Sequence, residues 1–170
     1  MPARKRLRFD PIAEARRQWV ERGWGNAASG MALVTSIMRA QQIYLGRIDA
    51  VLRPFGLTFA RFELLTLLSF TRSGALPLSK AGERLQVHPA SVTNVVDRLE
   101  SQGLVRRLPH PTDRRTTLVE ILPAGRRVLA AATAALNSEV FECPGVATEE
   151  ADAVVALLGG LRRSAGDFEA

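Results

Sequence analysis

The sequence predicts a mostly α-helical fold with one small β-hairpin, and two patterns support this. Apolar residues recur at three- and four-residue spacing along most of the chain, the period of helices that bury one face. Residues 104–121 instead hold two β-branched or apolar segments around a proline-containing turn, which is typical of a hairpin. The chain has 170 residues, 46% hydrophobic and 6% aromatic, enough to form the core of one ordinary domain without disulfides.

Residues 1–27 are predicted to form a basic arm. A short helix is expected from Pro11 to Arg22, and the sequence Gly23-Trp24-Gly25 breaks it. Trp19 and Trp24 need a partner surface, and packing against the body of the protein or a second subunit is the favoured interpretation. Two roles for the arm remain open, namely additional phosphate contacts or a clasp within a dimer.

A long helix is predicted from Ala28 to Arg53, because no proline interrupts this segment. Its apolar stripe keeps the helical period and comprises Val34, Ile37, Gln41, Leu45, Ile48 and Leu52. Pro54 and Gly56 end this helix. A second helix is expected to follow Thr58 as N-cap and to stop before Ser73-Gly74. Burial of this helix is indicated by its large apolar residues, which are Phe59, Phe62, Leu65 and Leu68.

Two short helices separated by a tight turn are predicted in the middle of the chain. Leu78-Ser79 supplies a staple residue and an N-cap for a helix from Lys80 to Leu85, and residues 86–88 form the turn. Pro89 then suits the first position of the next helix, where a missing N–H costs nothing. The inner stripe of that helix comprises Val92, Val95, Val96 and Leu99. The outer face comprises Ala90, Ser91, Asn94, Asp97, Arg98 and Ser101.

Gly103 is expected to end this helix in a Schellman motif, with Leu104 contacting Leu99. The segments 104–108 and 116–121 then form the hairpin, with a basic tip between them. After the hairpin, Pro123 and Gly125 open an alanine-rich helix that contains Val128, Leu129, Ala132 and Leu136, and Pro144-Gly145 closes it. The final helix is predicted to start at Thr148-Glu149-Glu150 and to carry Val154, Val155, Leu158 and Leu161.

The chain carries a net charge of +6, and this charge is unevenly placed. Residues 1–24 and residues 98–127 each hold seven basic and three acidic side chains, whereas residues 137–170 hold two arginines and seven acids. A basic body with an acidic tail suggests a polyanionic partner, with nucleic acid favoured over membrane.

Several classes of protein are not supported by the sequence. The single Cys143 excludes an internal disulfide and a cysteine-rich zinc site, and His88 and His110 lack metal-ligand spacing. No phosphate-binding glycine loop or nucleophile elbow is present. The longest uncharged run, residues 23–38, is too short to span a membrane. We therefore expect a cytoplasmic protein that is not an enzyme and that uses no metal or cofactor.

The middle of the chain has the properties of a DNA-binding element. A helix fits the major groove, and the N-terminal residues of the second helix in a helix-turn-helix usually reach base edges. Ser91, Thr93 and Asn94 are short polar side chains suited to that task. At the tip of the hairpin, Arg114 or Arg115 can lie along the minor groove. Asp113 would repel phosphate there, so its expected role is to orient a neighbouring arginine.

These segments resemble the MarR family of winged helix-turn-helix transcription regulators over about residues 31–161. The resemblance rests on Leu57-Thr58-Phe59-Ala60-Arg61-Phe62-Glu63-Leu64-Leu65, on the stretch from Leu85 to Val105, and on Pro111-Thr112-Asp113-Arg114-Arg115. It implies a homodimer whose first and last helices intertwine and a wing arginine, Arg115, in the minor groove. It also implies a near-palindromic operator and release of DNA when a small, often aromatic or anionic, ligand binds between the dimer and DNA-binding parts.

With this resemblance, the expected organisation is a basic arm (1–27), dimerisation helices (28–56 and 123–170) and a winged helix-turn-helix domain (57–122). The expected DNA-binding residues are Pro89, Ala90, Ser91, Thr93, Asn94, Arg98, His110, Arg114, Arg115 and Thr116. The expected ligand pocket comprises Gln41, Tyr44, Arg47 and Phe62, although a role of these side chains in the core is the favoured interpretation.

Some roles remain open at this level. Arg106, Arg107, Arg126 and Arg127 could face solvent or contact phosphate, and His110 could contact phosphate or only shape the loop. Arg98 is expected to act as a scaffold residue that pairs near Asp97 or with phosphate. The predicted function is a DNA-binding regulator, most simply a repressor, with double-stranded DNA, a second copy and a small-molecule effector as partners. The alternative is nonspecific nucleic-acid binding, as in an architectural protein.

Overall fold

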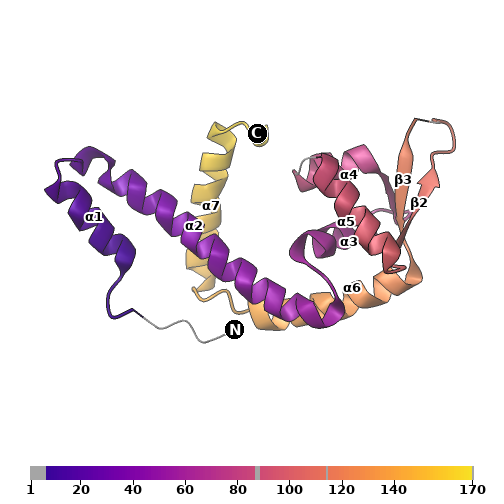
Figure 1. Cartoon of the computed structure of the whole chain (residues 1–170), viewed down its shortest axis with the longest axis horizontal. Helices are drawn as coiled ribbons and strands as arrows, with labels where there is room; N and C mark the ends of the chain where they lie inside the picture. Colours follow the sequence, from indigo (N-terminus) through magenta and orange to yellow (C-terminus); the bar gives the residue numbers. More distant parts are fainter. Residues whose placement is uncertain (1–6, 87–88, 114, 170) are drawn as a thin grey trace. The chain divides into compact units, whose positions relative to one another are not determined.

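The computed structural model describes residues 7–86, 89–113 and 115–169, and for Pro89 it describes the backbone alone. The chain divides into two compact units, residues 1–47 and residues 48–170 (Figure 1). The turn residues 87–88 and Arg114, which carry parts of the sequence prediction, lie outside the described residues. None of the helices in the described ranges is both long enough and apolar enough to cross a membrane.

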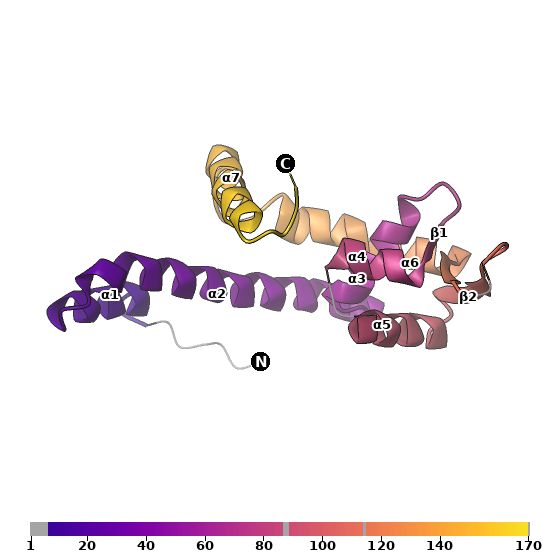
Figure 2. The same ribbon diagram turned by 90° about the horizontal axis from the view of Figure 1, so that it is seen from above.

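The first unit is a helical hairpin of α1 (Pro11–Glu21) and most of α2 (Gly25–Leu52), which lie side by side (Figures 1 and 2). The Asp10 carboxylate caps α1 by accepting a hydrogen bond from the Ile12 N–H at 2.9 Å, and Pro11 occupies the first turn. Trp19 and Trp24 pack edge to face with their ring centroids 5.2 Å apart. The two tryptophans are thus partners of each other across the turn between the helices.

The second unit begins with the end of α2 and a single 3₁₀ turn at Arg53–Phe55. The helices α3 (Phe59–Ser69), α4 (Leu78–Leu85), α5 (Pro89–Ser101) and α6 (Pro123–Leu136) surround a three-stranded antiparallel sheet. Its strands are β1 (Ala75–Pro77), β2 (Val105–Pro109) and β3 (Thr117–Ile121), in the order β1-β3-β2. The sequence prediction of a mostly helical fold with a small β-hairpin is confirmed.

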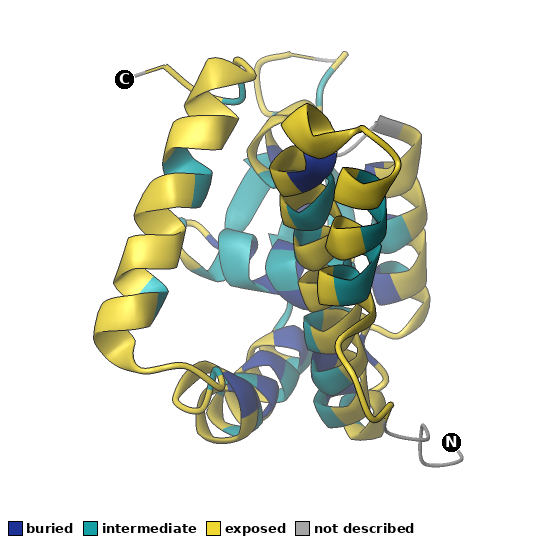
Figure 3. Ribbon diagram, turned by 90° about the vertical axis from the view of Figure 1, so that its left-hand side faces the viewer, coloured by how far each residue is buried: buried dark blue, intermediate teal, exposed yellow. Residues whose placement is uncertain are grey.

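The core of the second unit lies where these helices meet the sheet (Figure 3). Its fully buried side chains include Leu52, Leu64, Leu65, Leu68, Val96, Leu99 and Val119. The predicted inner stripe of α5 is buried at Val92, Val96 and Leu99, while Val95 is partly exposed. The apolar period therefore identified the face by which α5 is held to the rest of the unit.

The end of α5 follows the predicted Schellman geometry. Gly103 has a φ of +68°, its N–H donates to the Glu100 carbonyl at 2.9 Å, and the Leu104 N–H donates to the Leu99 carbonyl at 2.9 Å. Gly125 lets the start of α6 approach this turn, because a Cβ there would lie 2.2 Å from the Leu104 carbonyl oxygen. Helix α5, which the sequence analysis predicts to be the recognition helix, therefore meets strand β2 and α6 at one tightly packed point.

The start of α4 differs from the sequence prediction. The helix begins at Leu78 after Pro77, and no side chain caps it, so Ser79 is a residue inside the first turn and not the N-cap. The reason is β1, a strand missed by the sequence analysis, which pairs with β3 and leads directly into the helix. At the other end, Gln86 has a φ of +53°, and its side-chain amide donates to the Asp167 carbonyl at 3.1 Å.

The C-terminal part consists of α6, a π-helical turn at Asn137–Phe141 and α7 (Thr148–Ser164). Ala147, not Thr148, precedes the first turn of α7, and the Glu150 carboxylate accepts a hydrogen bond from the Ala147 N–H at 3.0 Å. None of the α7 side chains is buried, and its apolar side chains Val154, Val155, Leu157 and Leu161 are 48–76% exposed. This helix thus presents an apolar surface that the second unit does not cover.

Candidate nucleic-acid interface

The outward face of α5 is polar, as the sequence predicts. Ala90, Ser91, Asn94, Asp97 and Arg98 are exposed, while the opposite face of the helix packs into the core. Because exposed and buried positions alternate with the period of a helix, only the residues on the exposed face can contact another molecule. The predicted base-contacting residues Ser91 and Asn94 therefore lie on the available surface.

Thr93 lies on a different side of α5, the side that faces α4. It lines a cavity of about 640 Å³ between the two helices, together with Leu78, Ser79, Gly82, Glu83, Gln86 and Val92. Its side chain remains exposed. Of the three predicted base-contacting residues, Thr93 is thus the one at the edge of the surface and not at its centre.

Strands β2 and β3 form the predicted hairpin, or wing, next to α5 (Figure 1). Val105 pairs with Ile121 at its base, and Pro109 pairs with Thr117 near its tip. Beyond this pair, the His110 N–H donates to the Thr116 carbonyl at 3.1 Å. The basic tip predicted from the sequence is therefore the loop between residues 110 and 116.

Asp113 organises this loop. One carboxylate oxygen accepts a hydrogen bond from the backbone N–H of Arg115 at 2.9 Å, and the other accepts one from the Thr116 hydroxyl at 2.6 Å. The Thr116 hydroxyl, followed by the Arg115 N–H, lowers the pKa of Asp113 below its ordinary value. We expected Asp113 to orient an arginine side chain, but among the described residues it holds the arginine by its backbone. The Arg115 side chain is exposed and forms no hydrogen bond within the described part of the chain.

His110 also shapes the loop. Its Nδ1 lies 3.2 Å from the backbone N of Asp113 and 3.4 Å from that of Thr112, and it accepts hydrogen bonds from both. The sequence left open whether His110 contacts phosphate or shapes the loop, and these hydrogen bonds support the loop-shaping role.

Arg106 and Arg107 both pair with carboxylates. The Arg106 Nε lies 2.5 Å from Glu120 Oε2 on the neighbouring strand. Arg107 reaches the recognition helix, where its Nη2 lies 2.5 Å from Asp97 Oδ1 and its Nη1 pairs with Glu100. Partial burial lowers the pKa of Arg107, but the hydrogen bonds that it donates to Asp97 and Glu100 outweigh this effect, so the net shift of the pKa is upward.

This network was missed by the sequence analysis, which expected Arg98 near Asp97. The available signal was the i, i+3 spacing of Asp97 and Glu100, which places two carboxylates on the same side of α5. Arg98 is exposed, and its side chain has no ion pair with a described residue. Arg98 of α5 and Arg115 of the wing tip lack carboxylate partners among the described residues, and so do Arg126 and Arg127 at the start of α6.

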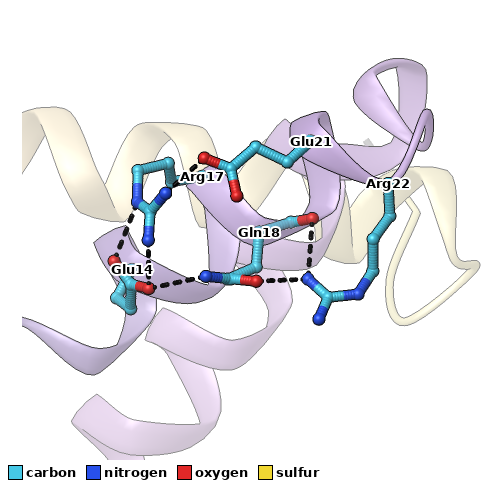
Figure 4. Close-up of polar contacts among 5 residues, drawn as sticks. All are labelled: Glu14, Arg17, Gln18, Glu21 and Arg22. Atoms are coloured by element: carbon cyan, nitrogen blue, oxygen red, sulfur yellow. Dashed lines mark hydrogen bonds and ion pairs between the residues drawn. The ribbon is translucent and has the colours of Figure 1, made fainter.

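Two arginines of the described part of the basic arm bond to other side chains of α1 (Figure 4). Arg17 pairs with Glu14 at 2.6 Å and also with Glu21, and Arg22 bonds to the side chain of Gln18. The Arg17 and Gln18 side chains lower the pKa of Glu14. Residues 7–27 hold four basic and three acidic side chains, a net charge of +1, so most of the excess positive charge of the arm belongs to residues 1–6.

The predicted ligand-pocket residues fall in both units. Phe62 is buried in the second unit and lines a cavity of about 530 Å³ between α3 and α6, together with Thr66, Ser69, Phe70, Arg126, Leu129, Ala130, Thr133 and Phe141. Gln41, Tyr44 and Arg47 belong to the first unit, where the Arg47 guanidinium lies 5.9 Å from the centroid of the Tyr44 ring. The cavity combines three phenyl rings with one guanidinium, which suits an amphipathic anion.

Comparisons with known proteins agree on one family. A sequence profile of the MarR family matches residues 57–117. The HTH-type transcriptional regulator MhqR of Bacillus subtilis (strain 168) is 30% identical over 120 residues, which cover 71% of this chain and 81% of MhqR. The uncharacterised HTH-type regulator YhbI of the same organism is 33% identical over 82 residues, so the match spans 48% of this chain and only 52% of YhbI.

Solved structures extend the comparison to the fold. Sco5413, a MarR family transcriptional regulator from Streptomyces coelicolor, is 53% identical, with a TM-score of 0.76 over 84% of this chain and 99% of that chain. CouR, bound to a 23-mer DNA duplex, is 23% identical, with a TM-score of 0.69 over 74% of this chain and 89% of CouR. CouR from Rhodococcus jostii RHA1 bound to p-coumaroyl-CoA has a TM-score of 0.67 at 23% identity, over 81% of this chain and 94% of CouR.

Proposed function

Because this chain belongs to the MarR family of transcriptional regulators, we propose that it is a dimeric, sequence-specific DNA-binding repressor that a small ligand releases from a near-palindromic operator. One observation carries the proposal: an exposed polar face on α5 stands beside a wing whose tip presents Arg115. A helix with short polar side chains can enter the major groove while a wing cation enters the minor groove.

In this proposal each predicted DNA-binding residue has a role. Ser91 and Asn94 contact base edges, with Thr93 at the periphery. Arg115 enters the minor groove. The remaining residues contact the DNA backbone or shape the interface, and they are Pro89, Ala90, Arg98, His110, Arg114 and Thr116. The exposure of Ser91, Asn94, Arg98 and Arg115 supports these assignments.

A second copy of the chain is the proposed partner for the uncovered apolar surfaces. Leu33, Val34 and Met38 of α2 are 54–60% exposed, and α7 exposes Val154, Val155, Leu157 and Leu161. Apolar surfaces of this extent usually mark association sites. A two-fold dimer would present two α5 helices about 34–36 Å apart, one turn of DNA, and so require an operator with two similar half-sites.

The proposed effector is a small aromatic or anionic molecule. The cavity lined by Phe62, Phe70, Phe141 and Arg126 supports this class, because the Arg126 guanidinium has no carboxylate partner among the described residues. Gln41, Tyr44 and Arg47 belong to the first unit and do not line this cavity, so a ligand-binding role for them is a separate proposal. Calorimetric titration of benzoate into the wild-type protein and into Arg126→Ala, both without DNA, tests this cavity. An unchanged affinity in the variant would reject the cavity as the effector site.

The test of the main function is a DNA-binding titration. The wild-type protein is mixed with labelled DNA from upstream of its own gene in the presence of excess unrelated DNA. If binding is sequence-specific, the protein should stay bound to the labelled DNA when unrelated DNA is present at about a thousandfold excess, because specific sites are usually bound at least this much more tightly than nonspecific DNA. Equal displacement by operator and unrelated DNA would favour the alternative function, nonspecific nucleic-acid binding.

A further inference from the structure

We propose that Arg107 is a positioning residue that joins the wing to the recognition helix, so that α5 and the wing meet DNA as one body. The inference rests on the proposed DNA-binding function and adds a residue to it that need not touch DNA. Arg107 lies in β2, yet its backbone N–H and its guanidinium donate to carboxylates of α5.

The contact involves both the backbone and the side chain of Arg107. Its N–H donates to Glu100 Oε1 at 2.8 Å, its Nη1 donates to the other oxygen of Glu100, and its Nη2 donates to Asp97 Oδ1 at 2.5 Å. The planar guanidinium has donors in a fixed fork, so two carboxylates one helical turn apart define its orientation. The strand can therefore rotate little against the helix while these bonds persist.

Burial distinguishes this contact from an ordinary surface ion pair. The side chain of Arg107 is 28% exposed, whereas that of its neighbour Arg106 is 55% exposed. A partly buried, bidentate arginine holds its geometry better than a mobile surface pair. It also lies two residues beyond Val105 along β2, closer to the tip than the Gly103-Leu104 turn that already anchors the base of the strand.

The same contact controls charge next to the proposed DNA surface. Asp97 lies on the exposed face of α5, three residues after Asn94, where an unpaired carboxylate would repel phosphate. Arg107 supplies the counter-charge to Asp97 from strand β2. Loss of Arg107 would thus both loosen the wing and uncover a negative charge on the recognition helix.

Arg107→Gln is the central variant, and Arg106→Gln is its matched control. Both remove one positive charge from adjacent residues of β2, but Arg106 pairs with Glu120 within the sheet and has no hydrogen bond or ion pair with the described side chains of α5. We expect Arg107→Gln to weaken operator binding about tenfold relative to Arg106→Gln, within the range of coupled charged contacts.

Two further measurements separate positioning from direct phosphate contact. A phosphate contact would lower the slope of log affinity against log salt by about one, whereas a positioning residue leaves most of this slope in place. The double variant Arg107→Gln, Asp97→Asn should recover part of the lost affinity, because it removes the uncovered carboxylate. A residue that contacted phosphate itself would show no such recovery.

A readout in the free protein avoids DNA altogether. Backbone amide exchange of residues 105–121 should rise in Arg107→Gln and stay at the wild-type level in Arg106→Gln, because only the first variant releases the wing from α5. If Arg107→Gln fails to fold, Glu100→Gln breaks the same contact from the helix, with Glu120→Gln as its control. Glu100→Gln should then show faster amide exchange in the wing and weaker operator binding than Glu120→Gln.

The inference is overturned if each variant matches its control in wing exchange and operator affinity. It is also overturned if Arg107→Gln lowers the salt slope by about one without recovery by Asp97→Asn. These results differ from failure of the proposed function, in which the wild-type protein itself would not prefer operator DNA over unrelated DNA.

Discussion

Single residues at the wing tip hold the loop that carries Arg115. Asp113 accepts hydrogen bonds from the backbone N–H of Arg115 and from the Thr116 hydroxyl. The His110 ring accepts hydrogen bonds from the backbone N–H groups of Thr112 and Asp113. The loop geometry thus comes from short-range side-chain to backbone bonds that replace a regular turn. A cation placed this way can reach DNA without its own side chain being fixed beforehand.

Asp113→Asn should weaken DNA binding about two- to tenfold, since it leaves one of the two acceptor bonds weaker or lost. Because the folded pKa of Asp113 lies below its ordinary value of 3.8, its stabilising effect is complete above that value and is lost as pH falls through the folded pKa. Wild-type affinity should therefore show no change from this group between about pH 6 and 8. Fluorescence anisotropy at several pH values checks both statements, and full affinity in Asp113→Asn would contradict the first.

Arg115→Ala tests the proposed minor-groove contact. We expect weaker operator binding with a salt slope reduced by about one phosphate equivalent, or by less if the residue mainly senses groove shape. Arg39→Ala in α2 removes the same charge outside the second unit and serves as control. Titrations at several salt concentrations measure the slope, and identical behaviour of the two variants would remove Arg115 from the interface.

Glu63 shows the opposite titration behaviour to Asp113. It is half-buried on α3, and desolvation raises the pKa of its carboxyl above the ordinary 4.5. The cost of a desolvated charge therefore appears as pH rises above the ordinary pKa of Glu63 and is complete once pH exceeds the folded pKa. Glu63→Gln should raise the melting temperature at pH 7, and the gain should vanish below the ordinary pKa. The exposed Glu142→Gln is the control, and a gain independent of pH would contradict the assignment.

At the scale of elements, the junction of α5, β2 and α6 determines how the recognition helix is placed. The Schellman turn at Gly103 ends α5, and Gly125 brings α6 against the Leu104 carbonyl. Arg107 adds a polar connection further along β2. The recognition helix is thus held at its C-terminal end, while its N-terminal residues Ser91 and Asn94 stay exposed.

Gly125→Ala should destabilise the protein by about 1–3 kcal/mol, because its methyl group would overlap the Leu104 carbonyl oxygen and force the backbone to shift. Gly30→Ala is the control, since a Cβ at this position of α2 meets no atom within 4 Å. That substitution should stabilise the helix by about 0.5–1 kcal/mol. Urea denaturation compares the two, and equal midpoints would contradict the close approach at Gly125.

At the scale of the whole molecule, charge and apolar surface are separated along the chain. The cations free of carboxylate partners, among the described residues of the wing and α6 start, are Arg115, Arg126 and Arg127. The acidic C-terminal part instead carries the exposed apolar side chains of α7. Such a division fits one surface for DNA and another for a second copy.

Leu157→Asp tests the proposed dimer surface. Leu157 is 76% exposed in a single chain, so a charge there should be tolerated by the fold but should weaken association about tenfold or more if the residue is buried in a dimer. Ser164→Asp adds the same charge at a polar position of α7 and serves as control. Sedimentation and operator titration follow the two variants. An unchanged dimer in Leu157→Asp would place the interface elsewhere.

The sequence alone determined the features that depend on neighbours a few residues apart. Helical periods predicted the helices and the buried face of α5, and Pro89 and Gly103 predicted where that helix begins and ends. The exposure of Ser91 and Asn94 follows from the same period. These signals are local because helix hydrogen bonds, caps and turns join residues within one or two turns.

Only the tertiary structure decided the features that join distant segments. Strand β1 is three residues long and exists because Ala75 pairs with Glu120, and its pairing explains why α4 starts at Leu78. The partners of Arg107 lie on another element, and the cavity around Phe62 assembles from α3, α6 and Phe141. No local pattern encodes such contacts, because they depend on which faces the packed core brings together and on which charges then meet.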